Sequence, residues 1–420
     1  MIAELIVENG FVLKGDGTPP FKASIVVDEG KIVEVGDAKG FTADEKLDAT
    51  RCLVVPGFVN THTHLSMTLF RGYADDLELG TWLRDHIWPV ESRLTSQSVR
   101  AGALLGVFEM IRSGTCAFAD MYFFMDEVAE VVKKAGLRAS LSYGMIELGD
   151  EERGRSELKK GKDFVRNYNG YADGRVKAMY GPHAPNTCSI EFLMKVRELA
   201  DKDGVGIHIH LLETEEERKQ LGETSLKKLE NFLKDDVLAA HCVWLSDTDI
   251  ELLVQKGVKV SHNPVSNMKL ASGTAKVHEM LEKGVCVSLG TDGCASNNNL
   301  DMFGTMKCTA LLQKIRLMSP TSTPANEVFS MATLNGAKSL GIHSGIIERG
   351  WNADFICLDL TSERMLPLHN AVSNIVYSAT PYDVVSCVVD GRVLMRDRKV
   401  LTLDKSEVIN EVEKAVEKLF

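Results

Sequence analysis

The sequence lacks several features that mark membrane, secreted or nucleic-acid-binding proteins. It has no run of about 18 apolar residues, so we predict no membrane-spanning helix. Residues 1–15 show no basic segment followed by an apolar core, and are interpreted as a first strand rather than a signal peptide. The nine cysteines include no CxxC pair, which indicates reduced thiols in a cytoplasmic protein. With 48 basic and 59 acidic residues the formal charge is −11, which argues against nucleic-acid or anionic-membrane partners.

Phosphate-binding loops of the GxGxxG or GxxxxGKS/T type are also absent, so a nucleotide-binding open sheet is not supported. The composition is globular, with 44% hydrophobic and 25% charged residues. In the middle of the chain, eight apolar segments alternate with segments of helical period, which predicts an α/β fold, a closed (β/α)8 TIM barrel. The expected strands are residues 53–64, 115–121, 137–145, 176–183, 205–212, 237–243, 258–263 and 285–292. The expected helices are residues 98–113, 126–135, 189–203, 223–233, 248–256 and 277–283.

Both ends of the chain have a different pattern. Short segments rich in Val and Ile, separated by glycine turns, fill the first 50 residues and recur after about residue 354. We therefore expect two domains: a small β-sandwich built from residues 1–52 plus 353–420, and a barrel over residues 53–352. A last amphipathic helix is expected at residues 405–419.

Ionisable residues gather at the C-terminal ends of the expected strands, which is the face of a barrel where active sites lie. An HxH motif ends both the first and the fifth strand, and a spacing of two places both imidazoles of each pair on one face. The set is His62, His64, His208, His210, Glu213, His241 and Asp292. Imidazoles and carboxylates that converge in a barrel are costly unless paired or metal-bound, so we predict a divalent metal site. The residues alone leave open whether His208 or His210 is the ligand.

The segments around these residues resemble those of a known superfamily. VPGFVNTHTH, GPHAP, HIHLLET, AAHCV, SHNPVSNMKLASG and LGTDGCASNNN are similar to motifs of the amidohydrolase superfamily. More narrowly, the chain resembles the methylthioadenosine/S-adenosylhomocysteine deaminase family, including the archaeal 5′-deoxyadenosine deaminases, over nearly its whole length. The resemblance implies a metal-dependent deaminase. Its substrates would be adenine nucleosides (5′-deoxyadenosine, 5′-methylthioadenosine, S-adenosylhomocysteine, adenosine), and its products inosine analogues and ammonia.

The resemblance also implies roles for individual residues. It makes Asp292 both a metal ligand and the group that takes the proton of the attacking water, with a contact to the substrate. It makes His241 a hydrogen-bond partner of the attacking hydroxide, and Glu213 the acid that contacts and protonates the ring nitrogen. The implied ligands of one divalent metal per chain are His62, His64, His210 and Asp292. Zinc is expected, although iron, manganese or nickel suits the same donors.

For the substrate, the resemblance implies that Glu91 accepts hydrogen bonds from the ribose hydroxyls and that His183 contacts the nucleoside. Trp82 is expected to form one side of the nucleoside pocket. Where some relatives have an arginine for the amino-acid carboxylate of S-adenosylhomocysteine, this chain has Tyr143. Arg153 or Arg155, in the charged loop expected after it, is a substitute. Our hypothesis is that small neutral 5′ groups are favoured.

Two other interpretations stay open. One is a guanine, cytosine or triazine aminohydrolase on the same barrel, and the other is a barrel scaffold without catalysis. The implied partner is a small nucleoside, and no nucleic acid or membrane is expected. By analogy with similar enzymes, which are often tetramers, a homo-oligomer is expected.

Overall fold

The computed structural model describes residues 2–222 and 225–420, and an eight-stranded parallel sheet forms its centre. The strands follow one another in chain order around this sheet. They are β6 (Phe58–Thr63), β7 (Thr115–Tyr122), β8 (Arg138–Met145), β9 (Val176–Pro182), β10 (Ile207–Leu211), β11 (Val237–His241), β12 (Lys259–His262) and β13 (Cys286–Leu289). Beyond the last strand, the backbone N–H of Asp292 donates to the carbonyl of His62 at 2.9 Å. This bond joins the last strand to the first, so the sheet forms a nearly closed barrel.

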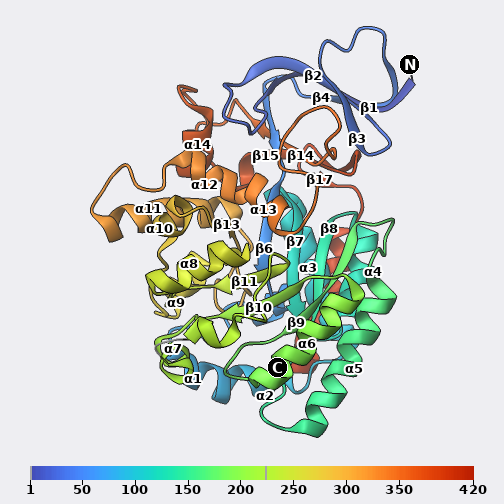
Figure 1. Cartoon of the computed structure of the whole chain (residues 1–420). Coiled ribbons are helices and arrows are strands. Elements are labelled where there is room, and N and C mark those ends of the chain that lie inside the picture. The colour runs from blue at the N-terminus through green and yellow to red at the C-terminus, as the bar shows by residue number, and fades with distance from the viewer. Residues whose placement is uncertain (1, 223–224) are drawn as a thin grey trace.

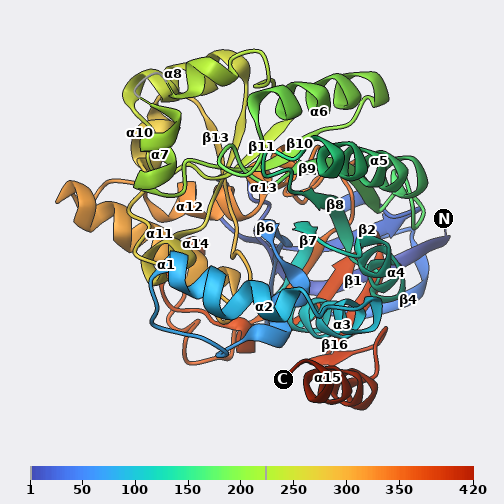
Figure 2. The ribbon, with the colours of Figure 1, turned by 90° about the horizontal axis from the view of Figure 1, so that it is seen from below.

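Helices surround the barrel between successive strands and after the last of them (Figures 1 and 2). They are α3 (Ser96–Ser113), α4 (Met125–Ala135), α5 (Glu151–Tyr168), α6 (Ile190–Asp203), α7 (Glu215–Leu221), η3 (Ser225–Leu229), α8 (Asp247–Lys256), α9 (Pro264–Lys269), α10 (Val277–Glu282), α11 (Met302–Leu317), α12 (Ala325–Ala332) and α13 (Leu334–Ser339). Capping residues set where these helices begin and end: Thr95 and Ser98 form a capping box at the start of α3, and Gly136 ends α4 with φ +90°. Of the helix predicted at residues 223–233, the first two residues lie outside the described chain, and η3 covers part of the rest.

The two chain ends form one further sheet, drawn at the top of Figure 1. Its strands are β1 (Ile2–Val12), β2 (Phe21–Asp28), β3 (Lys31–Gly36), β4 (Thr42–Asp48), β5 (Cys52–Pro56), β14 (Phe355–Asp359), β15 (Val384–Val389), β16 (Arg392–Arg396) and β17 (Lys399–Val400). Ile25 of β2 and Val388 of β15 share one core although three strands separate them in the sheet, so the sheet folds over on itself. The prediction of a second β unit made from both termini is therefore confirmed.

The chain after β14 adds α14 (Ala371–Tyr377), η4 (Pro381–Asp383) and α15 (Lys405–Leu419). The last of these packs on the barrel helix α3, where Lys418 Nζ lies 3.4 Å from Gln97 Oε1. Ion pairs also connect the two sheets. Arg138, at the start of the barrel strand β8, donates to Asp354 at 2.8 Å and to Asp390 at 2.6 Å, next to strands β14 and β15 of the terminal sheet. The predicted domain boundaries themselves stay predictions.

Two sequence predictions need correction. The strand expected at residues 53–64 is two strands, because β5 pairs with β14 and β1 in the terminal sheet and only β6 enters the barrel. The chain passes from the terminal sheet to the barrel at Gly57, where the Cβ atom of any other residue would collide with the thiol of Cys116. The charged loop expected around Arg153 and Arg155 is the 18-residue helix α5, which begins at the capping carboxylate of Asp150.

Between β6 and α3 the chain crosses the end of the barrel that lies away from the terminal sheet, at the bottom of Figure 1. This crossing contains η1 (Leu65–Phe70), α1 (Leu79–Thr81), the π-helical turn η2 (Trp82–Ile87) and α2 (Trp88–Glu91). The wider turn ends where the N–H of Trp88 donates to Leu83, just before Pro89, which has no N–H. This helical segment forms one wall of the cavity described next.

Candidate active site

The strand ends bring the predicted site residues to one end of the barrel. Nitrogen atoms of His62, His64 and His210 all lie within 4.8 Å of one another. The same distance limit encloses donor atoms of His62, His241 and Asp292. Residues from β6, β10, β11 and the loop after β13 therefore converge, as strand-end residues of a parallel barrel do.

Hydrogen bonds fix which nitrogen of two histidines faces the centre. His64 Nδ1 donates to the carbonyl of Met121 at 2.6 Å, and His210 Nδ1 donates to the carbonyl of His183 at 2.8 Å. A carbonyl only accepts, so each Nδ1 carries the proton and each Nε2 is left as a lone-pair donor. The two Nε2 atoms lie 3.2 Å apart, and His64 Nε2 is 3.3 Å from Asp292. Burial lowers the pKa of His210 well below its ordinary value, which keeps its imidazole neutral.

His62 provides the observation that tests whether a metal fits. It is fully buried, its Nε2 atom has no hydrogen-bond partner among the described residues, and that atom lies 3.5 Å from Asp292. Burial lowers the pKa of His62 to about 3, so the ring is neutral. A buried, unpaired imidazole nitrogen beside a carboxylate and two further lone-pair nitrogens is the donor set of a divalent transition metal. These residues therefore fit a metal ion.

His208, the alternative ligand, is directed elsewhere. Its Nε2 lies 2.8 Å from Nδ1 of His62, on the side of that ring away from Asp292. His208 is thus the hydrogen-bond partner of His62 Nδ1, whereas His210 directs its Nε2 toward the donor atoms of His64. His262, on β12, is fully buried, and neither of its ring nitrogens has a partner in the described chain.

Asp292 is held as a carboxylate. Burial raises its pKa, but the contacts with His62 and His64 outweigh burial, and the pKa lies well below its ordinary value. The hydroxyls of Ser266 and Ser296 donate to Oδ2 at 2.6 and 3.0 Å. Asp292 has φ +64° and His241 has φ +71°, conformations rare for non-glycine residues and concentrated at functional sites.

Glu213 and His241 lie side by side next to this centre, with His241 Nε2 3.7 Å from the Glu213 carboxylate. His241 Nδ1 donates to Asn267 Oδ1 at 2.8 Å, which turns Nε2 toward the cavity. Burial opposes charge on His241, but the carboxylates of Glu213 and Asp292 outweigh it and raise its pKa. Burial raises the pKa of Glu213. The arrangement places one carboxyl suited to carry a proton beside an imidazole suited to donate one.

The acidic run 215–217 would be interpreted from sequence as a solvated face, but Glu217 differs from the two residues before it. Glu215 and Glu216 are exposed, but Glu217 is only 3% exposed. Its carboxylate accepts the backbone N–H groups of Leu212 and Glu213 at 2.8 and 2.9 Å. It therefore fixes the backbone from which the Glu213 side chain extends.

A pH prediction follows for Glu217. Burial raises its pKa from 4.5 to about 7. Between pH 4.5 and 7 Glu217 holds a proton in the folded protein that it has lost in the unfolded chain. Its contribution to the free energy of unfolding therefore falls as pH rises through this interval, by on the order of 3 kcal/mol. We expect the free energy of unfolding of Glu217→Gln to fall less than that of the wild type over this interval in urea titrations. A parallel fall in both proteins would contradict this prediction.

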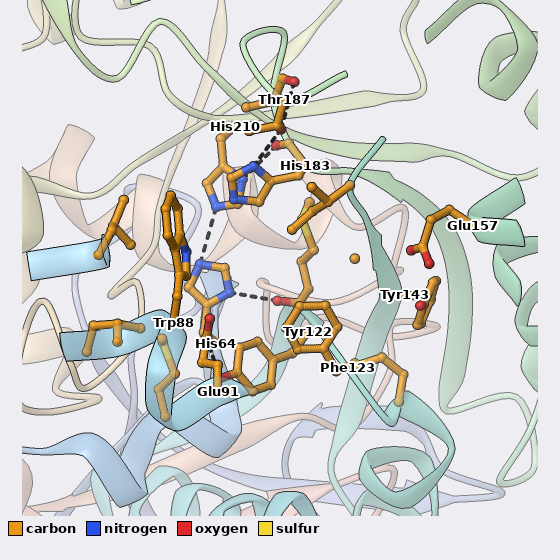
Figure 3. A pocket seen from close by; sticks show the side chains of 18 of the residues that line it. His64, Trp88, Glu91, Tyr122, Phe123, Tyr143, Glu157, His183, Thr187 and His210 are labelled. Atoms are coloured by element: carbon orange, nitrogen blue, oxygen red, sulfur yellow. Dashed lines mark hydrogen bonds between the residues drawn. The ribbon is translucent and has the colours of Figure 1, made fainter. Parts of the chain in front are cut away.

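A cavity of about 1100 Å³ opens from these residues (Figure 3). Trp82 and Glu91 line it from the segment before α3, and His183 lines it from the end of β9. Burial raises the pKa of Glu91, and the hydroxyl of Tyr122 donates to its Oε1 at 2.6 Å. His183 Nδ1 lies 2.9 Å from the hydroxyl of Thr187, which leaves Nε2 for a ligand. Arg153 lines the cavity, but Arg155 points to Glu151 at the surface and does not.

Two residues around the site, Tyr122 and Asp120, were not predicted from the sequence. Tyr122 ends β7 and links Glu91 to His64, whose ring centroid is 6.0 Å from its own. Asp120 accepts from the hydroxyl of Thr63 at 3.1 Å and from the N–H of Leu65 at 2.8 Å, so it holds the backbone on both sides of His64. Their position at the end of a predicted strand was the available signal, but neither belongs to a motif.

The fold and this site define a class: hydrolases whose parallel barrel presents histidines and an aspartate for a divalent metal at its strand ends. The profile of the amidohydrolase family matches residues 53–394. The chain belongs to the amidohydrolase family. The suspected family and the predicted fold class are thus confirmed.

Individual relatives agree with this assignment. The chain is 55% identical to a 5′-deoxyadenosine deaminase of Methanosarcina mazei, over 100% of this chain and 99% of the relative. It is 48% identical to a 5-methylthioadenosine/S-adenosylhomocysteine deaminase of Thermococcus onnurineus, over 94% of this chain and 95% of the relative. A crystal structure of an adenosine deaminase from Xanthomonas campestris with bound zinc is 32% identical with a TM-score of 0.93, covering 100% of this chain and 99% of that chain. None of the helices in the described part of the chain is long and apolar enough to span a membrane.

Proposed function

We propose that the protein is an adenine-nucleoside deaminase, which adds water at C6 of the base, releases ammonia and leaves the inosine analogue. The observation that carries this proposal is the grouping of Glu213, His241 and Asp292 beside three histidines at one end of a cavity large enough for a nucleoside. The names of the relatives support it, because all three are deaminases of adenine nucleosides.

We assign one divalent metal, with zinc as the first choice, to four residues, which are His62, His64, His210 and Asp292. Such an ion activates water near neutral pH when it is bound. Asp292, as an ionised carboxylate, accepts the proton of the attacking water. Glu213 carries its proton to the ring nitrogen next to C6, because its raised pKa keeps that proton available. His241 directs its Nε2–H to the oxygen that becomes attached at C6.

The other residues orient the nucleoside. Glu91 has one carboxylate oxygen occupied by Tyr122, and the second accepts from the cis hydroxyls of the ribose. His183 Nε2 accepts from a hydroxyl of the same sugar, since its Nδ1 is occupied by Thr187. Trp82, which is buried, packs against the nucleoside. The cytoplasmic location and the homo-oligomer remain predictions from the sequence.

An ammonia-release assay tests the proposal. The purified protein, loaded with zinc, is incubated with adenosine, 5′-deoxyadenosine, 5′-methylthioadenosine and S-adenosylhomocysteine, and separately with guanine, cytosine and an aminotriazine. We expect release from adenine nucleosides alone, its loss after chelation and its return with zinc. Release from guanine, cytosine or the triazine alone would support an aminohydrolase of different substrate, and no release at all would support a barrel scaffold.

A further inference from the structure

The cavity extends beyond the residues that we assign to the nucleoside. It reaches a wall formed by one side of α5 and by Tyr143 at the end of β8, which Figure 3 shows together with Glu157. Residues of α5 on this wall recur at helical spacing: Arg153, Glu157, Lys160, Phe164 and Asn167. The cavity, at about 1100 Å³, slightly exceeds the roughly 300–1,000 Å³ of typical small-molecule pockets. A bound nucleoside therefore leaves room at this wall for its 5′ substituent.

Glu157 is the unusual member of this wall. Its side chain is only 9% exposed, although glutamates are seldom buried without a partner. That partner is Lys160, whose Nζ lies 2.9 Å from Glu157 Oε1 and 5.8 Å from the centroid of the Tyr143 ring. The side chain of Lys160 is 55% exposed and Arg153 is exposed as well, whereas the side chain of Glu157 is not, so the buried charge at the cavity wall is negative.

This charge distribution discriminates between nucleosides according to the charge of their 5′ substituent. A 5′ group that ends in a carboxylate meets the Glu157 carboxylate in a space where water screens poorly, and like charges repel there. It also competes with Glu157 for Lys160. A methyl or methylthio group instead contacts the rings of Tyr143 and Phe164, which line the same wall.

We propose that Glu157 is a specificity-determining residue that rejects nucleosides whose 5′ substituent is anionic and so favours small neutral ones. This inference rests on the proposed function. It concerns only the ratio between substrates, because Glu157 lies at the 5′ wall and is not part of the group formed by Glu213, His241 and Asp292. Glu157 discriminates through charge, so its effect has opposite signs for anionic and cationic substituents.

The test uses three analogues of 5′-methylthioadenosine whose thioether chain ends in a carboxylate, an amine or a methyl group. In Glu157→Gln we expect the kcat/KM of the carboxylate analogue, relative to the methyl analogue, to rise about tenfold. The relative kcat/KM of the amine analogue should fall. Lys160→Gln should move both ratios the other way, because it leaves the carboxylate unpaired. A pocket that had merely loosened would shift both analogues in the same direction.

Glu151→Gln is the matched control, since it removes the same charge from the same helix at a side chain that is 86% exposed. Its ratios should equal those of the wild type. Unchanged ratios in Glu157→Gln, or an equal change in Glu151→Gln, would overturn the inference while the deaminase proposal stands. If the wild type released ammonia from adenosine but from none of the three analogues, the inference would fall and the deaminase proposal would stand; no release from adenosine, 5′-deoxyadenosine or 5′-methylthioadenosine either would overturn both.

Discussion

The Glu213→Gln variant should lose kcat for adenine nucleosides by roughly 10²–10⁴-fold while its metal content stays near that of the wild type. A glutamine has nearly the same shape, but it cannot deliver a proton to the ring nitrogen. Glu213 lies next to His241 and outside the donor group formed by His62, His64 and His210, so its replacement leaves those ligands in place. Steady-state kinetics and elemental analysis of the same preparation measure both quantities.

Glu216→Gln is the control for this variant, because it makes the same change three positions along the chain at an exposed side chain. It should keep the kcat of the wild type. Loss of metal from Glu213→Gln would show that Glu213 belongs to the metal site and that its assignment as the acid is wrong. A kcat within a few-fold of the wild type would show that another group protonates the base.

The second large effect is expected for His64→Ala, which should purify with only a small fraction of the metal of the wild type and without measurable deaminase activity. Its Nε2 lies 3.3 Å from Asp292 and 3.2 Å from His210 Nε2, so its removal opens the centre of the donor group. Metal content is measured by elemental analysis after purification in buffer containing zinc.

His369→Ala, at an exposed position remote in sequence from the strand ends, serves as its control and should retain metal and activity. Thermal unfolding of the metal-free proteins shows whether His64→Ala is folded, since the comparison is informative only for a folded chain. Full metal content in a folded, inactive His64→Ala would remove His64 from the ligand set.

The barrel and the centre of the site could be predicted from the sequence because both depend on strong local patterns. Near-continuous apolar strands with ionisable residues just after them predict a parallel barrel and the face on which its site lies. His62 and His64 are therefore placed together with His210 and Asp292 before any coordinates are known. What the pattern could not distinguish was His208 from His210, since both point to one side of β10.

Other features depend on packing that no local pattern records. The burial of Glu217 results from its bonds to two backbone groups, whereas its neighbours in sequence are solvated. Helix α5 was missed because its buried positions are few and include two glycines, Gly154 and Gly161, so its apolar period is weak. The strand at residues 53–64 was misjudged because an unbroken apolar run does not show that the chain passes from one sheet to another.

That passage at Gly57 limits how enzymes of this architecture can be recombined. No linker separates β5, in the sheet from the two termini, from β6, which bears His62. Inserting or deleting one residue there would turn alternate side chains of β6 to the opposite face and direct the histidines out of the lumen. When the outer sheet is exchanged between relatives, in the laboratory or in evolution, the number of residues between β5 and β6 therefore has to stay the same.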